Sequence, residues 1–161
     1  MKFNLIRIDD RLIHGQVALG WTRAKGIDTI VAVDDKVAKD GLQCSLLHMA
    51  TPPGVKSYIV SVADAVTLIQ SGKLDKKHIM LLSKGPEALI QMIDAGVELD
   101  EVNIGNVRSN PERKKYLSHV FATDEEIKVW KVLAEKTKLI AQILPDSPKV
   151  NFNELLDKVS L

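Results

Sequence analysis

The chain has a single cysteine, almost no net charge and no long hydrophobic run, and each shortage excludes a class of protein. Because Cys44 stands alone, we exclude a disulfide framework and a cysteine-based zinc site. The 22 basic and 21 acidic residues leave a net charge of +1, which argues against a general nucleic-acid binder, since such a protein needs a basic surplus to neutralise phosphates. No apolar run approaches the ~18 residues that a membrane span requires.

The composition points to one soluble domain. With 45% hydrophobic and 27% charged residues over 161 positions, the chain can bury a core and stay soluble. Its first ten residues end in two acids and hold no secretory hydrophobic region. We therefore expect a single domain over residues 1–161 and a cytoplasmic location.

Short β-branched runs alternate with segments of helical periodicity, which predicts alternating strands and helices. Capping pairs start three of the helices, namely Asp40 with Gln43, Ser61 with Asp64, and Thr123 with Glu126. The predicted strands are 3–8, 29–33, 57–62, 78–83, 101–107 and 139–144. The predicted helices are 16–24, three that follow Asp40, Ser61 and Thr123, one from Pro86 to Gly96, and a short one at 151–159.

This alternation predicts parallel strands joined by right-handed crossovers. The expected fold class is therefore α/β, with an open, mainly parallel twisted sheet and helices on both faces. Ligands of such sheets bind at the carboxyl ends of the strands. The loops at that edge are 9–15, 34–40, 84–86 and 105–111, and the first is the richest in chemistry. The segment 110–115 is the most loop-like stretch.

The loop 9–15 sets His14 among charged side chains just before a predicted helix. Histidine can act as a base or nucleophile near neutral pH. Arg11 offers a planar fork for a three-oxygen anion, and the free N–H groups of residues 15–17 favour an anion at the helix start. These parts suit a transient phosphoryl group on His14. The alternative is that Asp10 caps a turn and His14 is an ordinary loop residue.

Other motifs give weaker evidence of function. Gly15 to Gly20, followed by Trp21, resembles a P-loop whose lysine is replaced, so we do not expect nucleotide binding there. The remaining histidines lack metal-ligand spacing, so we expect neither a metal site nor a cofactor. An acidic pair after the first strand also occurs in response-regulator receivers. That hypothesis fits poorly, because Asp64 falls inside a helix, Lys84 follows strand four rather than strand five, and His14 is left without a role.

The string RIDDRLIHGQV (7–17), followed by Trp21 and Thr22, resembles the active-site segment of the IIB subunits of the mannose/fructose/sorbose-type sugar phosphotransferase system. Residues 103–106 (NIGN) resemble the N-x-G segment of that family, and residues 120–125 its next strand-to-helix step. The likeness covers essentially the whole chain and is strongest in the first 22 residues.

The resemblance implies the reaction. A phosphohistidine on a IIA protein or domain donates its phosphoryl group to His14 at Nδ1, the pros nitrogen. His14 then passes it to a sugar delivered by the membrane subunits IIC and IID. The resemblance also implies an activity as a protein-N(pi)-phosphohistidine–sugar phosphotransferase, peripherally associated with the membrane permease complex. It requires no cofactor, because the donor is already activated.

The resemblance also suggests roles for the neighbours of His14. Arg11 stabilises the phosphoryl group, and Arg7 is expected to add to this. Gln16 matches the motif, and we infer that it helps to stabilise the phosphoryl group as well. Asp9 and Asp10 match the motif, and we expect them to hold Arg11 or the imidazole in place.

One segment departs from the family pattern, namely Val107-Arg108-Ser109 after the N-x-G-N string. Arg108 is either a third phosphate contact, a docking residue for IIA, or a solvated surface side chain. With Arg113, Lys114 and Lys115 it offers a basic surface for an acidic partner, and Ile13 is a candidate apolar contact.

Two alternatives to sugar transfer stay open: a receiver-like or purely phospho-signalling module, and a binding domain with an inactive motif. A homo-oligomer is also possible, and the sequence does not give the oligomeric state.

Overall fold

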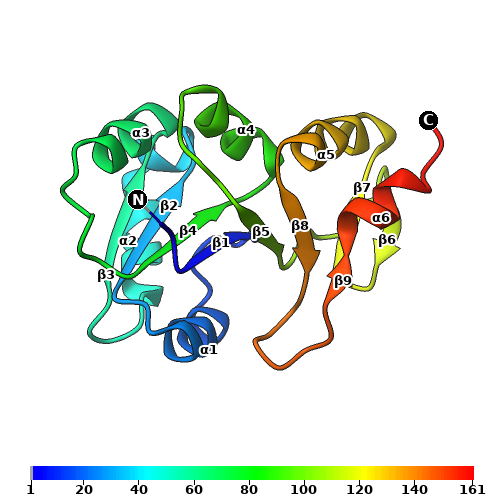
Figure 1. Ribbon diagram of the computed structural model, residues 1–161. Coiled ribbons are helices and arrows are strands. Elements are labelled where there is room, and N and C mark those ends of the chain that lie inside the picture. The colour runs from blue at the N-terminus through cyan, green and yellow to red at the C-terminus, as the bar shows by residue number, and fades with distance from the viewer. Residues whose placement is uncertain (1) are drawn as a thin grey trace.

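The computed structural model describes residues 2–161, so Met1, which the predicted domain includes, lies outside the described residues. Over this range the chain builds one large sheet between two layers of helices (Figure 1). The strands of this sheet are β1 (Leu5–Ile8), β2 (Thr29–Val33), β3 (Lys56–Val60), β4 (Ile79–Ser83), β5 (Glu101–Ile104), β8 (Lys138–Ala141) and β9 (Val150–Asn151).

The strand order within the described chain is β3-β2-β4-β1-β5-β8-β9. Neighbouring strands pair in parallel except at the edge, where β9 is antiparallel to β8. The predicted α/β class, with an open and mainly parallel sheet, is confirmed.

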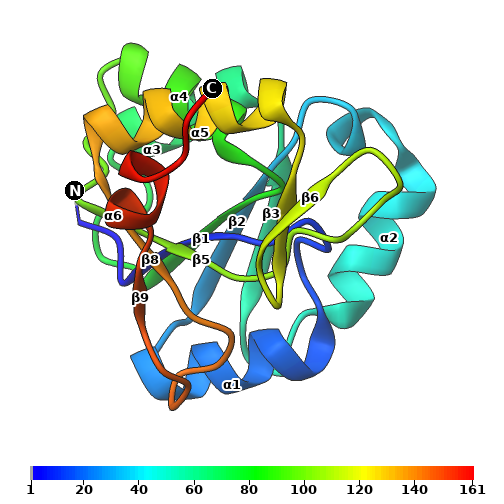
Figure 2. The same cartoon turned by 90° about the vertical axis from the view of Figure 1, so that its right-hand side faces the viewer.

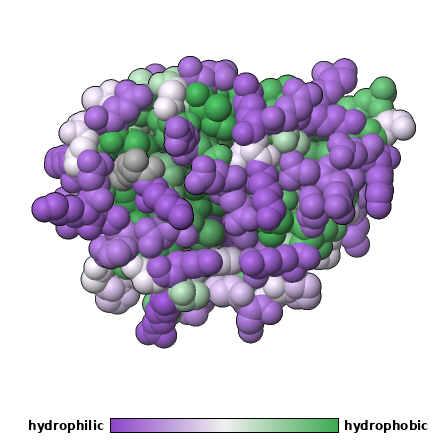
Figure 3. All heavy atoms as spheres, in the orientation of Figure 1, coloured by the Kyte–Doolittle hydropathy of each residue, from purple (hydrophilic) through white to green (hydrophobic). Residues whose placement is uncertain are grey.

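The helices cover both faces of the sheet (Figures 1 and 2). They are α1 (Gly15–Lys25), the 3-10 turn η1 (Val37–Lys39), α2 (Gly41–Ala50), α3 (Val62–Gln70), α4 (Pro86–Asp94), α5 (Asp124–Lys136) and α6 (Phe152–Asp157). None of the helices within residues 2–161 is long and apolar enough to cross a membrane. The face of the molecule in Figure 3 is mostly hydrophilic, with hydrophobic side chains in scattered areas.

Each face of the sheet buries its own core, because side chains alternate along a strand. On the face of α3, α4, α5 and α6, residues such as Val31 and Leu81 pack in one apolar cluster with Leu89 and Trp130. On the face of α1 and α2, the intervening residues Ile30 and Leu82 pack with side chains that include Trp21. The fully buried strands explain why the sequence shows continuous apolar runs rather than alternation.

The predicted helix starts are confirmed. The Ser61 side chain accepts a hydrogen bond from the Asp64 backbone N–H at 3.1 Å, and Thr123 with Glu126 forms a reciprocal capping box. The Asp40 side chain accepts from the Gln43 backbone N–H, also at 3.1 Å. These caps satisfy backbone donors that have no partner within the helix.

Three predictions about the elements were wrong. Residues 114 and 115, predicted within the loop-like segment 110–115, begin strand β6 (Lys114–Leu117), which pairs antiparallel with β7 (Val120–Ala122) in a separate hairpin. The strand predicted at 139–144 ends at Ala141, and the Gln142 side chain donates to the Pro145 and Ser147 carbonyls in the following loop. The final helix begins at Phe152, since Val150–Asn151 pairs with β8 as the short strand β9.

The sheet reverses its winding beside β1. The loop after β1 leads to α1 on one face, whereas the loop after β4 leads to α4 on the other. The chain after β5 passes through β6 and β7 before it forms α5 on that second face (Figure 2). Since β1 pairs with both β4 and β5, these loops part at the carboxyl end of the central strand. That is where ligands of open α/β sheets bind.

Candidate functional site

Backbone hydrogen bonds fasten the loop after β1 to its neighbours. The Asp9 N–H donates to the Ser83 carbonyl at 2.9 Å, and the Asp10 N–H donates to the Asn106 carbonyl at 2.8 Å. Leu12 adopts a left-handed conformation with φ of 57°, which costs a non-glycine residue about 1–2 kcal/mol. The burial of Leu12 and Ile13 in the core on the α1 face offsets this strain. Ile13 is only 3% exposed, so its predicted role as a partner contact was wrong.

His14 follows these anchors as the N-cap of α1 and is exposed. Its carbonyl accepts the first helical bond from the Ala18 N–H at 2.7 Å. Within the described chain, no side chain caps α1, and its first turn holds no acidic residue. Gly15 and Gln16 are exposed beside His14. The helix therefore presents free N–H groups and its positive end next to the imidazole.

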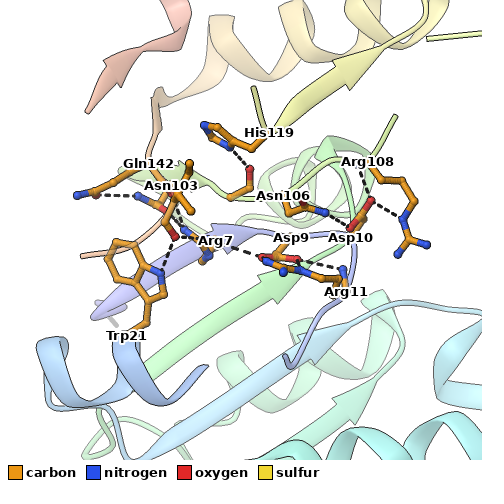
Figure 4. Close-up of polar contacts among 12 residues, drawn as sticks. Arg7, Asp9, Asp10, Arg11, Trp21, Asn103, Asn106, Arg108, His119 and Gln142 are labelled. Atoms are coloured by element: carbon orange, nitrogen blue, oxygen red, sulfur yellow. Dashed lines mark hydrogen bonds and ion pairs between the residues drawn. The ribbon is translucent and has the colours of Figure 1, made fainter. Parts of the chain in front are cut away.

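Arg11 is held by Asp9 through both carboxylate oxygens. Its Nε donates to Asp9 Oδ1 at 2.8 Å and its Nη2 to Asp9 Oδ2 at 2.7 Å (Figure 4). The Asp9 side chain is 2% exposed and the Arg11 side chain is 30% exposed. The hydrogen bonds that Arg11 donates to Asp9 raise the pKa of Arg11 above its ordinary value. Arg11 is thus a fixed cation with its other edge toward solvent.

Asp10 joins the loops after β1 and β5. Its carboxylate accepts from the Arg108 N–H at 2.8 Å, from Arg108 Nε at 3.0 Å and from Asn106 Nδ2 at 2.9 Å (Figure 4). Burial raises the pKa of Asp10, but the hydrogen bonds from Arg108 and Asn106 outweigh it and hold the pKa below its ordinary value. Asp10 therefore orients Arg108 and its loop, not Arg11 or the imidazole.

Arg7 lies behind this surface rather than on it. Its side chain is 2% exposed and points to the α1 face of the sheet, where its Cζ lies 4.9 Å from the centroid of the Trp21 ring. Its Nη1 donates to Asn103 Oδ1 and to the Gln142 carbonyl, and its Nη2 donates to the Ile143 carbonyl at 2.8 Å. This burial leaves the guanidinium no open path to a phosphate on the surface.

The hairpin β6–β7 braces the loop after β5. Arg113 binds both carboxylate oxygens of Glu126 at 2.9 and 2.6 Å, and its Nη1 donates to the Arg108 carbonyl at 2.8 Å. The hydrogen bonds from Arg113 hold the pKa of Glu126 below its ordinary value.

Two further contacts involve the hairpin and its neighbours. The His119 ring hydrogen-bonds with the Gly105 carbonyl. Since Lys114 also pairs with Asp124, much of the predicted basic surface is engaged within the molecule.

Arg11 thus lies in the loop that leads to the exposed His14 and Gln16 at the start of α1, whereas the side chains of Asp9 and Arg7 are buried. The sequence reasoning had no role for Asn103, Asn106, Gln142 or Trp21 in this arrangement. The available signal was a polar residue inside an otherwise apolar strand: Asn103 pairs in register with Arg7 across β5 and β1.

Comparison with known proteins shows the family. The family model described as "PTS system sorbose subfamily IIB component" matches residues 3–161. The fructose-specific EIIB component of the phosphotransferase system (PTS) of Bacillus subtilis (strain 168) is 32% identical over 161 residues, or 99% of each chain. The mannose-specific EIIAB component of Escherichia coli (strain K12) is 32% identical over 160 residues, which are 99% of this chain and 50% of that protein.

The fold agrees with the sequence comparison. The crystal structure of the IIBSor domain of the sorbose permease from Klebsiella pneumoniae matches with a TM-score of 0.92 at 29% identity, over 100% of this chain and 99% of that one. The chain therefore belongs to the sorbose subfamily of PTS IIB components, the sugar-phosphotransfer components of the sorbose and mannose type.

Proposed function

We propose that His14 accepts a phosphoryl group from a phosphohistidine on a IIA protein or domain and passes it to a sugar presented by the membrane subunits IIC and IID. The observation that carries this proposal is the exposed His14 at the uncapped start of α1, three residues along the chain from an arginine fixed by a buried carboxylate. Under this proposal the chain works in the cytoplasm, docked on its permease, with residues 1–161 acting as one domain.

The chemistry needs positioning and charge more than acid or base catalysis. As the nitrogen–phosphorus bond of the donor breaks, a new one forms at Nδ1 of His14, the atom that the family resemblance indicates. The phosphoryl group in transit carries its charge on three equatorial oxygens. The free edge of Arg11 and the N–H groups of residues 15–17 can meet these oxygens, with Gln16 beside them. Sugar transfer then breaks the bond to His14 as a sugar hydroxyl oxygen bonds to phosphorus.

Two residues change their roles from those first expected. Arg7 is buried and bonded to strand and loop carbonyls, so we assign it no contact with the phosphoryl group. Asp10 supports the loop after β5 through Arg108, whose side chain is 65% exposed. We therefore keep Arg108 in the proposal as a docking residue for the donor or the permease.

The receiver alternative receives no support. Asp9 and Asp10 each bind an arginine instead of forming an open acidic pair. Asp64 lies in the first turn of α3 and not at the end of a strand.

The experiment that tests the proposal is transfer of labelled phosphoryl from a phosphorylated IIA donor, with the label mapped by mass spectrometry. We expect the label on His14, lost in acid and kept in alkali. Alkali-labile label on Asp9, Asp10 or Asp64 would establish the receiver class instead. No label, from a donor that does phosphorylate its own IIB protein, would contradict the proposed relay for that pair.

A further inference from the structure

Arg7 is a buried cation that does not contact the transferred phosphoryl group. Removing a guanidinium from water carries a cost of several kcal/mol that a protein offsets only with well-placed partners. Three of its hydrogen bonds go to neutral oxygens, and its Nε has no partner among the described residues. Burial lowers the pKa of Arg7 to about 10, against the attraction of Asp9, so it stays charged at neutral pH.

The carboxylate that faces this buried charge is Asp9. Arg7 Nη2 lies 3.7 Å from Asp9 Oδ2, and both side chains are 2% exposed. On its other side, Asp9 accepts the two hydrogen bonds that fix Arg11. Asp9 thus lies between a buried arginine and a partly exposed one (Figure 4). Without Arg7, this buried carboxylate loses one of the two cations that face it, and its position beside Arg11 is less firmly held.

Two residues of the N-x-G segment, Asn103 and Gly105, contact the Arg7 guanidinium and fix its position. Asn103 accepts a hydrogen bond from Arg7 Nη1 through its side-chain oxygen. At Gly105, an added Cβ would lie 2.2 Å from Arg7 Nη2 and 2.5 Å from its Cζ. Since the backbone of Gly105 has no positive φ, the need for glycine here comes from the guanidinium packed on it. The segment therefore has a physical role: it leaves the space that Arg7 fills.

We propose that Arg7, seated by Asn103 and Gly105, is a positioning residue for phosphoryl transfer, which acts by holding Asp9 in place so that Asp9 fixes the Arg11 guanidinium. This inference rests on the proposed function of His14 and deepens it. Arg7 does not touch the phosphoryl group, and its effect on transfer passes through Asp9 and Arg11.

The test uses Gly105→Ala, which displaces Arg7 without changing Asp9, Arg11 or His14. Gly20→Ala is the matched control, because a Cβ at Gly20 meets nothing within 4 Å. We expect Gly105→Ala to slow phosphorylation of His14 by at least about tenfold, since misplacement by about 1 Å can cost ~100-fold. The control should transfer at the wild-type rate. A Gly105→Ala chain that folds and transfers like wild type overturns the proposal.

A double-mutant cycle separates positioning from general damage. If Arg7 acts through Arg11, then Gly105→Ala should have little further effect on the rate in an Arg11→Ala background. If the rate of the double variant instead falls by the product of the two single effects, Gly105→Ala acts independently of Arg11. That result would overturn the inference. If Gly105→Ala does not fold, Arg7→Lys and Arg7→Met replace it. The lysine variant, which keeps the charge, should retain the greater part of the rate, and equal rates would contradict the role of the charge.

The side-chain NMR signal of the Arg11 Nε–H provides a readout that needs no donor. Its hydrogen bond to Asp9 should slow exchange with water in the wild type and in Gly20→Ala, and the protection should be lost in Gly105→Ala. Unchanged protection would overturn the proposed positioning even if the rate fell. If the wild-type chain takes no label on His14, the proposed function fails, and this signal still decides whether Arg7 positions Arg11.

Discussion

The two faces of the central sheet are built from the same strands but bury different kinds of side chain. The face covered by α3, α4 and α5 packs an apolar cluster, with Leu89 and Leu133 fully buried. The face covered by α1 also holds the buried polar side chains of Arg7 and Asn103, with Gln142 at the end of β8. One face is therefore organised around apolar burial, and the other also carries the charges that organise the loop of His14.

Because of this difference, we expect substitutions on one face to affect mainly stability and substitutions on the other to affect mainly activity. Burial of apolar area is the main source of stability, so the α3–α5 face should govern the free energy of unfolding. Polar groups buried on the α1 face are costly but directional, so they should govern the geometry of the site. The predictions below test this division, from the largest effect to the smallest.

His14→Gln should abolish transfer and leave stability nearly unchanged. The side chain is exposed and does not cap α1, so we expect the free energy of unfolding to change by no more than about 0.5 kcal/mol. Chemical denaturation and a phosphoryl-transfer assay on the same preparation measure both effects. His48→Gln, an exposed histidine on α2, serves as the control that should still accept label. Label on the His14→Gln chain would contradict the assignment.

Arg11→Ala should slow transfer by ~10²–10³-fold, as removal of one electrostatic donor to a transition state commonly does. Its matched control is Arg23→Ala, at an exposed arginine in the last turn of α1. Single-turnover rates at saturating donor distinguish this loss from weaker docking. Equal rates for the two variants would remove Arg11 from the mechanism.

Leu89→Ala should lower the free energy of unfolding by about 3 kcal/mol, the ordinary cost of a large cavity in a packed core. Leu89 is fully buried on the α3–α5 face, whereas Leu42, 72% exposed on α2, offers the same substitution without a cavity. At temperatures where the variant stays folded, transfer should proceed at nearly the wild-type rate. A specific loss of transfer in folded Leu89→Ala would contradict the division between the faces.

Asp10→Asn should cost about 1 kcal/mol at neutral pH, because a half-buried, charge-assisted contact with Arg108 is lost. The pKa of Asp10 is lowered in the folded state, so its contribution is present above the ordinary value of 3.8 and is lost as the pH falls through the lower folded value. Denaturation at a series of pH values should therefore show the wild type and the variant converging in acid. A constant difference between pH 7 and pH 2 would refute this linkage.

Local signals in the sequence predicted most of the fold. The caps at Ser61 and Thr123 depend on residues three positions apart, and such short-range chemistry can be recognised without knowing the tertiary structure. The β6–β7 hairpin was missed because its lysine-rich first strand resembles a solvated loop, and its pairing is visible only in three dimensions. Strand β9 was missed because two residues are too few to show a period.

The site was predicted less completely than the fold. The proximity of Asp9, Arg11 and His14 follows from the spacing within one loop. The burial of Arg7 does not, since an arginine between Ile6 and Ile8 also suits a strand with one face in water. Its partners Asn103 and Gln142 lie 96 and 135 residues away along the chain, and only the order of β1, β5 and β8 brings them together.

A chase of the label from His14 would show whether the phosphoryl group reaches a sugar. The chain, first phosphorylated by its IIA donor and separated from it, is mixed with membranes that contain family IIC and IID subunits, with and without their sugar. We expect label to leave His14 and to appear on the sugar when sugar and both membrane subunits are present. Label that stays on His14, in membranes that accept phosphoryl from another family IIB protein, would contradict sugar transfer and leave a phospho-signalling module.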